Sequence, residues 1–120
     1  MAYSLTLLTN KVGIVTGAGS PFGIGRSLVM SLALAGAKAV YATDLTLVNI
    51  PSLQQEVKDA GSSCQVHGAI LDVTSEDQTV SVLKEIIATY GRLDFYFANA
   101  GFGNYKYGLG HATSRVYAAN

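Results

Sequence analysis

The chain has 120 residues, of which 49% are hydrophobic and 13% charged, and its formal net charge at pH 7 is zero. Its eight basic residues are scattered along the sequence, so we exclude nucleic acid and anionic membranes as partners. The apolar stretch at residues 28–42 is too short and too interrupted to span a bilayer. The single cysteine cannot form an internal disulfide, and these features together favour a cytoplasmic protein with one domain.

The first three elements follow one another closely. Residues 12–16 form an apolar run that predicts a buried strand. Residues 24–34 show helical spacing of apolar side chains, and Gly36 ends that helix. Residues 39–43 predict a second strand that ends at Asp44.

Two further helical patterns alternate with two more strands. After a loop that contains Pro51, residues 53–60 predict a helix and residues 65–71 a third strand. Ser75 and Gln78 fit a capping box, which opens a helix that runs to Gly91. Residues 93–98 then predict a fourth strand.

Apolar strands that alternate with helices indicate parallel strands buried on both faces. The sequence therefore predicts an α/β fold with a Rossmann-like, doubly wound parallel sheet, incomplete at about four strands with flanking helices. We place a cofactor-binding unit at residues 1–101 and a tail at 102–120. Gly101 to His111 is expected to be loop, and residues 112–120 are at most the beginning of a helix.

A glycine-rich segment joins the first strand to the first helix. It contains Gly17, Gly19, Gly23 and Gly25. Glycines allow a tight turn and let backbone N–H groups approach phosphates, while the following helix presents its positive end to their charge. The segment therefore predicts a site for the pyrophosphate of a dinucleotide, although glycines also serve ordinary turns between a strand and a helix.

An acidic residue follows at the spacing that a dinucleotide site requires. Asp44 lies 19 residues after Gly25, near the ~20 residues expected for a carboxylate that binds ribose hydroxyls. It would repel a 2′-phosphate, and no Lys or Arg lies between Lys38 and Lys58 to neutralise one. We therefore favour NAD over NADP; the alternative is that Asp44 is a solvated loop carboxylate.

These segments resemble the N-terminal half of a short-chain dehydrogenase/reductase. The resemblance rests on the glycine turn, the Asp72-Val73 pair after the third strand, the Tyr90-Gly91-Arg92-Leu93-Asp94 segment and the Ala98-Asn99-Ala100-Gly101 motif. It implies an NAD(P)-dependent oxidoreductase that transfers hydride between the cofactor and a small alcohol or carbonyl substrate. The residues that it implies at the cofactor are Gly17, Gly23, Ile24, Gly25, Asp44, Asp72, Val73, Asn99, Ala100 and Gly101. Structural duty at the strand end is the rival role for Asn99.

The sequence departs from the family pattern in two ways. Five residues rather than three separate Gly17 from Gly23, and one of them is a proline, so the phosphate loop should be longer. The resemblance also implies a catalytic serine and a Tyr-x-x-x-Lys pair, but none of the seven tyrosines has a lysine four residues later. Asn120 alone weakly matches a catalytic position of the family.

Three interpretations of function remain open. The chain is the cofactor-binding half of an oxidoreductase, inactive alone; a non-catalytic dinucleotide-binding module or pseudoenzyme; or a truncated gene product without independent function. A fourth strand left at the sheet edge would invite association into a homo-oligomer. Cys64 is expected to be a small buried residue rather than a nucleophile, and His67 and His111 lie too far apart in sequence to support a metal site.

Overall fold

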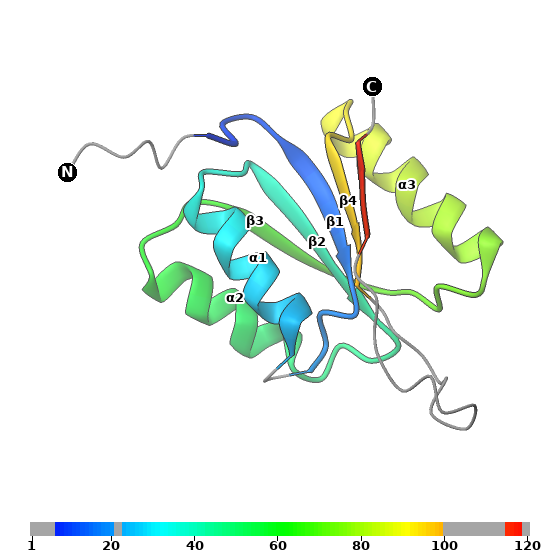
Figure 1. The fold of residues 1–120 in the computed structure, drawn as a ribbon, viewed down its shortest axis with the longest axis horizontal. Helices are drawn as coiled ribbons and strands as arrows, with labels where there is room; N and C mark the ends of the chain where they lie inside the picture. The colour runs from blue at the N-terminus through cyan, green and yellow to red at the C-terminus, as the bar shows by residue number, and fades with distance from the viewer. Residues whose placement is uncertain (1–6, 21–22, 100–114, 119–120) are drawn as a thin grey trace.

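In the part of the chain that the structure describes, five strands form one sheet in the order β3-β2-β1-β4-β5 (Figure 1). The computed structural model describes residues 7–20, 23–99 and 115–118. The strands are β1 (Val12–Thr16), β2 (Ala39–Asp44), β3 (Gln65–Ile70), β4 (Phe95–Ala98) and β5 (Arg115–Ala118). The first four are parallel, as the sequence predicts, and β5 runs antiparallel to β4. Because β1 pairs with both β2 and β4, the strand order reverses at β1, which is the position where doubly wound folds bind ligands.

Helices cover both faces of the sheet (Figure 1). They are α1 (Ile24–Leu34), α2 (Ile50–Asp59) and α3 (Glu76–Tyr90). One apolar cluster packs α1 and α2 against one face, and a second packs α3 against the other. Neighbouring residues of β2 divide between them: Val40 belongs to the first cluster and Tyr41 to the second. The near-continuous apolar strands are thus explained by burial on both sides.

The three helices start and end close to the predicted positions, with one shift. The bounds of α1 match those expected, but α2 begins at Ile50 rather than residue 53 because Pro51 lies in its first turn, where a missing N–H costs nothing. At α3, Ser75 Oγ accepts a hydrogen bond from Gln78 N at 3.2 Å, which confirms half of the capping box. The Gln78 side chain instead accepts from Asp72 N at 2.8 Å.

Strand β4 begins at Phe95, two residues later than predicted. At Asp94 the side chain, rather than the backbone carbonyl, accepts a hydrogen bond from the first residue of β1. The Asp94 backbone N donates to Val12 O at 2.6 Å, and its Oδ2 atom accepts from Val12 N at 2.8 Å. Arg92 donates to both carboxylate oxygens of Asp94, from Nε at 2.7 Å and Nη2 at 2.8 Å. This ion pair lowers the pKa of Asp94 below its usual range.

The end of the chain corrects the sequence prediction. Residues 115–118 form β5 rather than the beginning of a helix, and β4 is therefore not left at the edge of the sheet. The physical reason is that β4 offers unpaired backbone groups on that side, and Val116 and Tyr117 have high strand propensity. The predicted loop at 101–111 lies outside the described residues.

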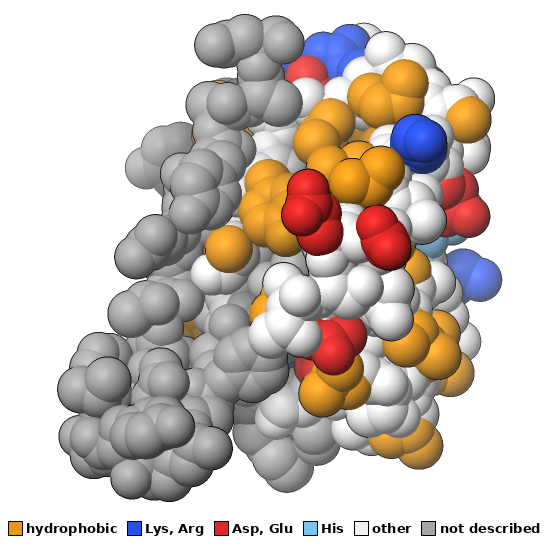
Figure 2. Space-filling view, turned by 90° about the vertical axis from the view of Figure 1, so that its right-hand side faces the viewer, with side chains coloured by type: hydrophobic (Ala, Val, Ile, Leu, Met, Phe, Trp, Pro, Cys, Tyr) orange, Lys and Arg blue, Asp and Glu red, His pale blue; other side chains and the backbone are white. Residues whose placement is uncertain are grey.

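The outward side of α3 carries apolar side chains among charged ones (Figure 2). Val80 and Ile87 are exposed and, with Leu83, line a shallow hollow of about 380 Å³ on this helix. Within the ranges that the structure describes, no helix has the length and apolar character needed to cross a membrane.

Candidate functional site

The glycine-rich loop leaves the carboxyl end of β1 and leads into the amino end of α1. Gly17 has φ of 70°, a left-handed conformation that favours glycine, and Ala18 N donates to Thr43 O at 3.0 Å, which holds the loop against β2. Gly23 is the N-cap of α1, and no acidic residue lies in the first turn. The free N–H groups and the dipole of this helix end therefore favour an anion there.

Gly25 allows three segments of the chain to meet. A Cβ atom at this position would lie 2.3 Å from Gly17 O and 2.9 Å from Asn99 Nδ2. Both distances are too short for any side chain, so α1 approaches the loop and β4 at a separation that only glycine permits. Ile24, beside it, is 64% exposed at the start of the helix.

Asn99 joins β4 to β1 where the strand order reverses. Its backbone N donates to Thr16 Oγ1 at 2.9 Å, and its side-chain Nδ2 lies 3.5 Å from Gly17 O. Asn99 is buried, and its contacts engage a side-chain hydroxyl of β1 and a backbone carbonyl of the glycine loop. The structural role that competes with cofactor contact is therefore present in the fold. Ala100, Gly101 and Asn120, which were also expected near the site, lie outside the described residues.

Asp44 contacts the glycine loop directly. Its Oδ2 atom accepts a hydrogen bond from Gly19 N at 2.7 Å, and its Oδ1 atom accepts one from Leu45 N at 2.7 Å. A Cβ atom at Gly19 would lie 2.6 Å from Asp44 Oδ2, so this approach also depends on glycine. Each carboxylate oxygen has a second lone pair that a ribose hydroxyl can use.

Asp72 is held within its own turn at the end of β3. Its Oδ1 atom accepts from Thr74 N at 2.9 Å and also from the Thr74 hydroxyl. The Thr74 side-chain and backbone hydrogen bonds lower the pKa of Asp72. Val73 packs partly against the apolar cluster beneath α3. The structure thus gives Asp72 and Val73 a local role in the connection between β3 and α3.

Two residues that the sequence analysis did not identify also reach this loop region. Asn49, just before α2, donates from Nδ2 to Gly19 O at 2.8 Å. Arg26, in the first turn of α1, donates from Nη1 to Asn49 O at 3.3 Å and from Nη2 to Glu56 Oε1 at 2.7 Å. The sequence signal for Arg26 was its position directly after Gly25. Asn49 is the N-cap of α2, but the predicted helix began at residue 53, so this position carried no such signal.

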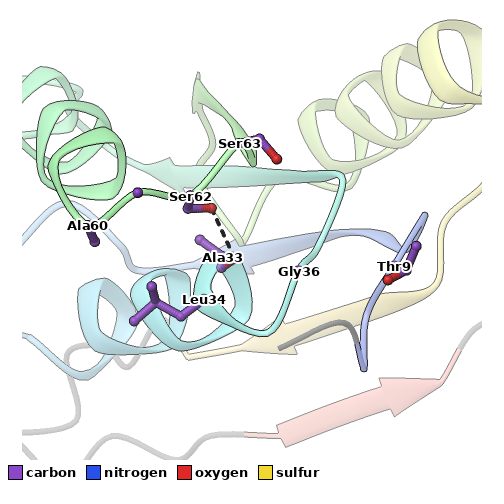
Figure 3. Close-up of a pocket in the computed structure, with 8 residues that line it drawn as sticks. Thr9, Ala33, Leu34, Gly36, Ala60, Ser62 and Ser63 are labelled. Atoms are coloured by element: carbon purple, nitrogen blue, oxygen red, sulfur yellow. Dashed lines mark hydrogen bonds between the residues drawn. The ribbon is translucent and has the colours of Figure 1, made fainter. Parts of the chain in front are cut away.

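A separate pocket lies at the opposite end of the sheet from the glycine loop (Figure 3). It has a volume of about 380 Å³ and lies at the ends of α1 and α2, near the amino ends of the strands. In Figure 3 the Ser62 hydroxyl donates to Ala33 O at 3.0 Å across this pocket, which binds the turn after α2 to α1. The lining residues are Thr9, Ala33, Leu34, Gly36, Ala60, Gly61, Ser62 and Ser63. None of the residues expected at the cofactor lines it.

Cys64 and His67, the remaining described candidates, both have contacts typical of residues that support the fold. Cys64 is buried, as predicted, and burial raises the pKa of its thiol to about 11. His67 stacks on Tyr41 with ring centroids 4.7 Å apart and hydrogen-bonds Tyr90 through Nε2. Among the described side chains, no group of three His, Cys, Asp or Glu residues is placed to hold a metal ion. His111 lies outside the described residues.

The fold and this site place the chain in a known class. The model of the short chain dehydrogenase family matches residues 11–119. The chain therefore belongs to the short-chain dehydrogenase/reductase family, whose members are oxidoreductases that use a nicotinamide dinucleotide.

Individual relatives agree with this assignment. The chain is 37% identical over 94 residues to a 3-oxoacyl-(acyl-carrier-protein) reductase of Thermotoga maritima, covering 78% of this chain and 36% of that protein. It is 34% identical over 116 residues to a trihydroxynaphthalene reductase of Colletotrichum orbiculare, covering 94% of this chain and 40% of that one. The chain thus spans about two fifths of the length of these relatives.

Solved structures show the same fold. A metagenomic short-chain oxidoreductase in complex with NADP superposes with a TM-score of 0.71 at 28% identity, covering 80% of this chain and 41% of the other. The glucose dehydrogenase of Caenorhabditis elegans in its apo-form gives a TM-score of 0.71 at 30% identity, covering 86% and 43%.

Proposed function

We propose that this chain binds a nicotinamide dinucleotide at the carboxyl ends of β1, β2 and β4, as the cofactor-binding part of a short-chain dehydrogenase/reductase. The observation that carries the proposal is the approach of Gly25 to Gly17 and Asn99 at the point where the strand order reverses. This packing brings the free N–H groups of α1 to the mouth of the loop, where they would bind the pyrophosphate. The nicotinamide would supply hydride chemistry to a small alcohol or carbonyl substrate.

Asp44 supports a preference for NAD over NADP. Two backbone N–H groups hold its carboxylate at the end of β2, which is the position from which such a group binds the ribose hydroxyls. A 2′-phosphate placed there would meet a negative charge. The nearby cation, Arg26, is paired with Glu56 at 2.7 Å, and this pairing reduces its ability to neutralise a phosphate. The residues therefore fit NAD better.

Titration calorimetry of the 120-residue chain with NAD, NADP and AMP tests this proposal. We expect NAD to bind more tightly than NADP, and Asp44→Ala to weaken NAD by about tenfold through loss of the ribose hydrogen bonds. Glu56→Gln is the matched control for loss of a carboxylate near the same loop, and it should affect NADP more than NAD by freeing Arg26. The absence of heat with all three nucleotides would overturn the proposal.

Catalysis is a separate question from binding. Hydride transfer to a carbonyl needs a positioned proton donor, and no Tyr-x-x-x-Lys pair occurs in these 120 residues. We therefore propose that the chain alone binds the cofactor without turnover, which is the behaviour of a non-catalytic dinucleotide-binding module. An assay with NADH and a panel of aldehydes and ketones checks this, and measurable NADH oxidation by the purified chain would contradict it.

A further inference from the structure

Both backbone groups of Gly19 are held by side chains from the connection between β2 and α2. Asp44 Oδ2 accepts from Gly19 N at 2.7 Å, and Asn49 Nδ2 donates to Gly19 O at 2.8 Å. These two bonds cross 25 and 30 residues of sequence. The middle of the glycine loop is therefore fixed from outside the loop.

Asn49 is itself held in place by its neighbours. Its backbone O accepts from Arg26 Nη1 at 3.3 Å and from Ser52 Oγ at 2.9 Å. The Arg26 side chain is only 13% exposed, and Glu56 Oε1 accepts from its other two nitrogens, Nε at 3.1 Å and Nη2 at 2.7 Å. The chain of contacts thus runs from α2 through Arg26 in α1 to Asn49 and ends on Gly19.

The length of this loop explains why such a support is needed. Five residues separate Gly17 from Gly23, two more than the family pattern. Each additional residue that must be ordered costs about 1–2 kcal/mol of backbone entropy. A loop whose N–H groups are already oriented binds phosphate without that loss at the moment of binding.

We propose that Asn49 is a positioning residue for the cofactor, which presets the enlarged phosphate loop by clamping Gly19 against Asp44. This inference rests on the proposed function. Asp44 then has two roles at the cofactor. Its carboxylate holds the phosphate loop by accepting a hydrogen bond from Gly19 N, and its remaining lone pairs can accept hydrogen bonds from the ribose hydroxyls. Removing the Asn49 amide should loosen the phosphate side of the site while leaving the Asp44 carboxylate in place for the ribose.

Nuclear magnetic resonance of the ¹⁵N-labelled 120-residue chain tests the clamp without any ligand. A Gly19 N–H that donates to a carboxylate should resonate downfield and exchange slowly with solvent. Asn49→Ala should move this resonance upfield and raise its exchange rate by about tenfold. The matched control is Gln55→Ala, which removes an exposed amide of α2 that donates a hydrogen bond to Asp59, and it should leave Gly19 unchanged.

Binding measurements then separate positioning from general damage. Asn49→Ala should weaken NAD by about tenfold, equivalent to the loss of one hydrogen bond that orders the loop. It should change the affinity for adenosine, which has ribose hydroxyls but no phosphate, by less than twofold. Asn49→Asp keeps the size but cannot donate, and its negative charge also repels the phosphates. It should therefore weaken NAD at least as much as Asn49→Ala, and it serves if the alanine variant does not fold.

The outcomes are distinguishable. A wild-type chain that binds neither NAD nor adenosine overturns the proposed function, whereas the Gly19 resonance still reports whether the clamp exists. Wild-type binding of NAD with unchanged affinity in both Asn49 variants overturns the positioning role alone. Equal losses for NAD and adenosine also overturn it, because they would show that the whole site had collapsed.

Discussion

Gly25 lies so close to Gly17 that a Cβ atom on Gly25 would stand 2.3 Å from the Gly17 carbonyl oxygen. This contact fixes the first turn of α1 against the end of β1. It also sets the distance between the amino end of the helix and the loop that would receive a pyrophosphate. A methyl group at this position must push the two apart.

The first prediction concerns this contact. Gly25→Ala should lower the free energy of unfolding by about 1–3 kcal/mol, the usual cost of overpacking, and weaken NAD by at least about tenfold. Urea denaturation and calorimetric titration measure the two effects. Gly61→Ala is the control, since Gly61 has φ of 85° but open space around it and lies at the end of the sheet away from the glycine loop. It should cost stability but not affinity, and a Gly25→Ala chain with wild-type affinity would contradict the prediction.

The second prediction concerns the bond between β1 and β4. Thr16→Val removes the hydroxyl that accepts from the buried Asn99 N–H at 2.9 Å. We expect a loss of about 1 kcal/mol in the free energy of unfolding, at the lower end for a buried group because Asn99 N also lies 3.0 Å from Phe97 O. Thr16→Ser keeps the hydroxyl but loses a buried methyl group, so hydrogen exchange of the Asn99 amide separates the two variants. Exchange should accelerate in Thr16→Val and not in Thr16→Ser, and equal exchange in both would rule out the hydroxyl as the cause.

The third prediction is a pH dependence that originates at Asp94. Its pKa is lowered in the folded state, chiefly by Arg92, so its ionised form stabilises the fold above the unfolded-state pKa of about 3.9. This contribution is lost as the pH falls through the lower folded-state pKa. Asp94→Asn should therefore lower stability at pH 6 by about 1 kcal/mol, with a smaller difference from wild type at pH 3.

Urea denaturation at the two pH values measures this effect. Asp59→Asn is the control, because Asp59 is exposed at the end of α2 and contacts Gln55 within its own helix. A difference between wild type and Asp94→Asn that stayed constant from pH 6 to pH 3 would show that ionisation of Asp94 is not responsible.

The fourth prediction concerns Cys64. Burial raises the pKa of its thiol to about 11, so at pH 8 only about one molecule in a thousand carries the reactive thiolate. Labelling with a disulfide reagent should be at least about 100-fold slower in the native chain than in the chain unfolded in urea. Rapid labelling of the native chain, at a rate equal to that of the unfolded chain, would contradict the buried assignment.

Local sequence patterns were sufficient to predict the elements that they define directly. Apolar runs and glycine stops located β1, α1 and the end of α3, and Ser75 identified the start of α3. The start of α2 was displaced because Pro51 was interpreted as a loop residue, although the first turn of a helix tolerates it. β5 could not be predicted from its own four residues, since they form a strand only against the backbone of β4.

In the candidate site, too, the sequence predicted what depends on spacing along the chain but not what depends on packing between helices. The spacing from Gly25 to Asp44 is visible along the chain, and the structure brings Asp44 to the loop. Arg26 was missed because only the residues between Lys38 and Lys58 were considered as cations near Asp44, and Asn49 was missed because it lies in the stretch interpreted as a loop around Pro51. Their contacts depend on the packing of α1 beside α2, which brings together residues 23 to 30 positions apart.

The antiparallel pairing of β5 with β4 has a topological consequence. In the usual doubly wound order, the strand that follows β4 lies parallel to it on that same side. β5 occupies this position in the opposite direction, so the two arrangements are mutually exclusive. A parallel strand could pair with this side of Phe95–Ala98 only after residues 115–118 had separated from it, because both need the same backbone N–H and C=O groups.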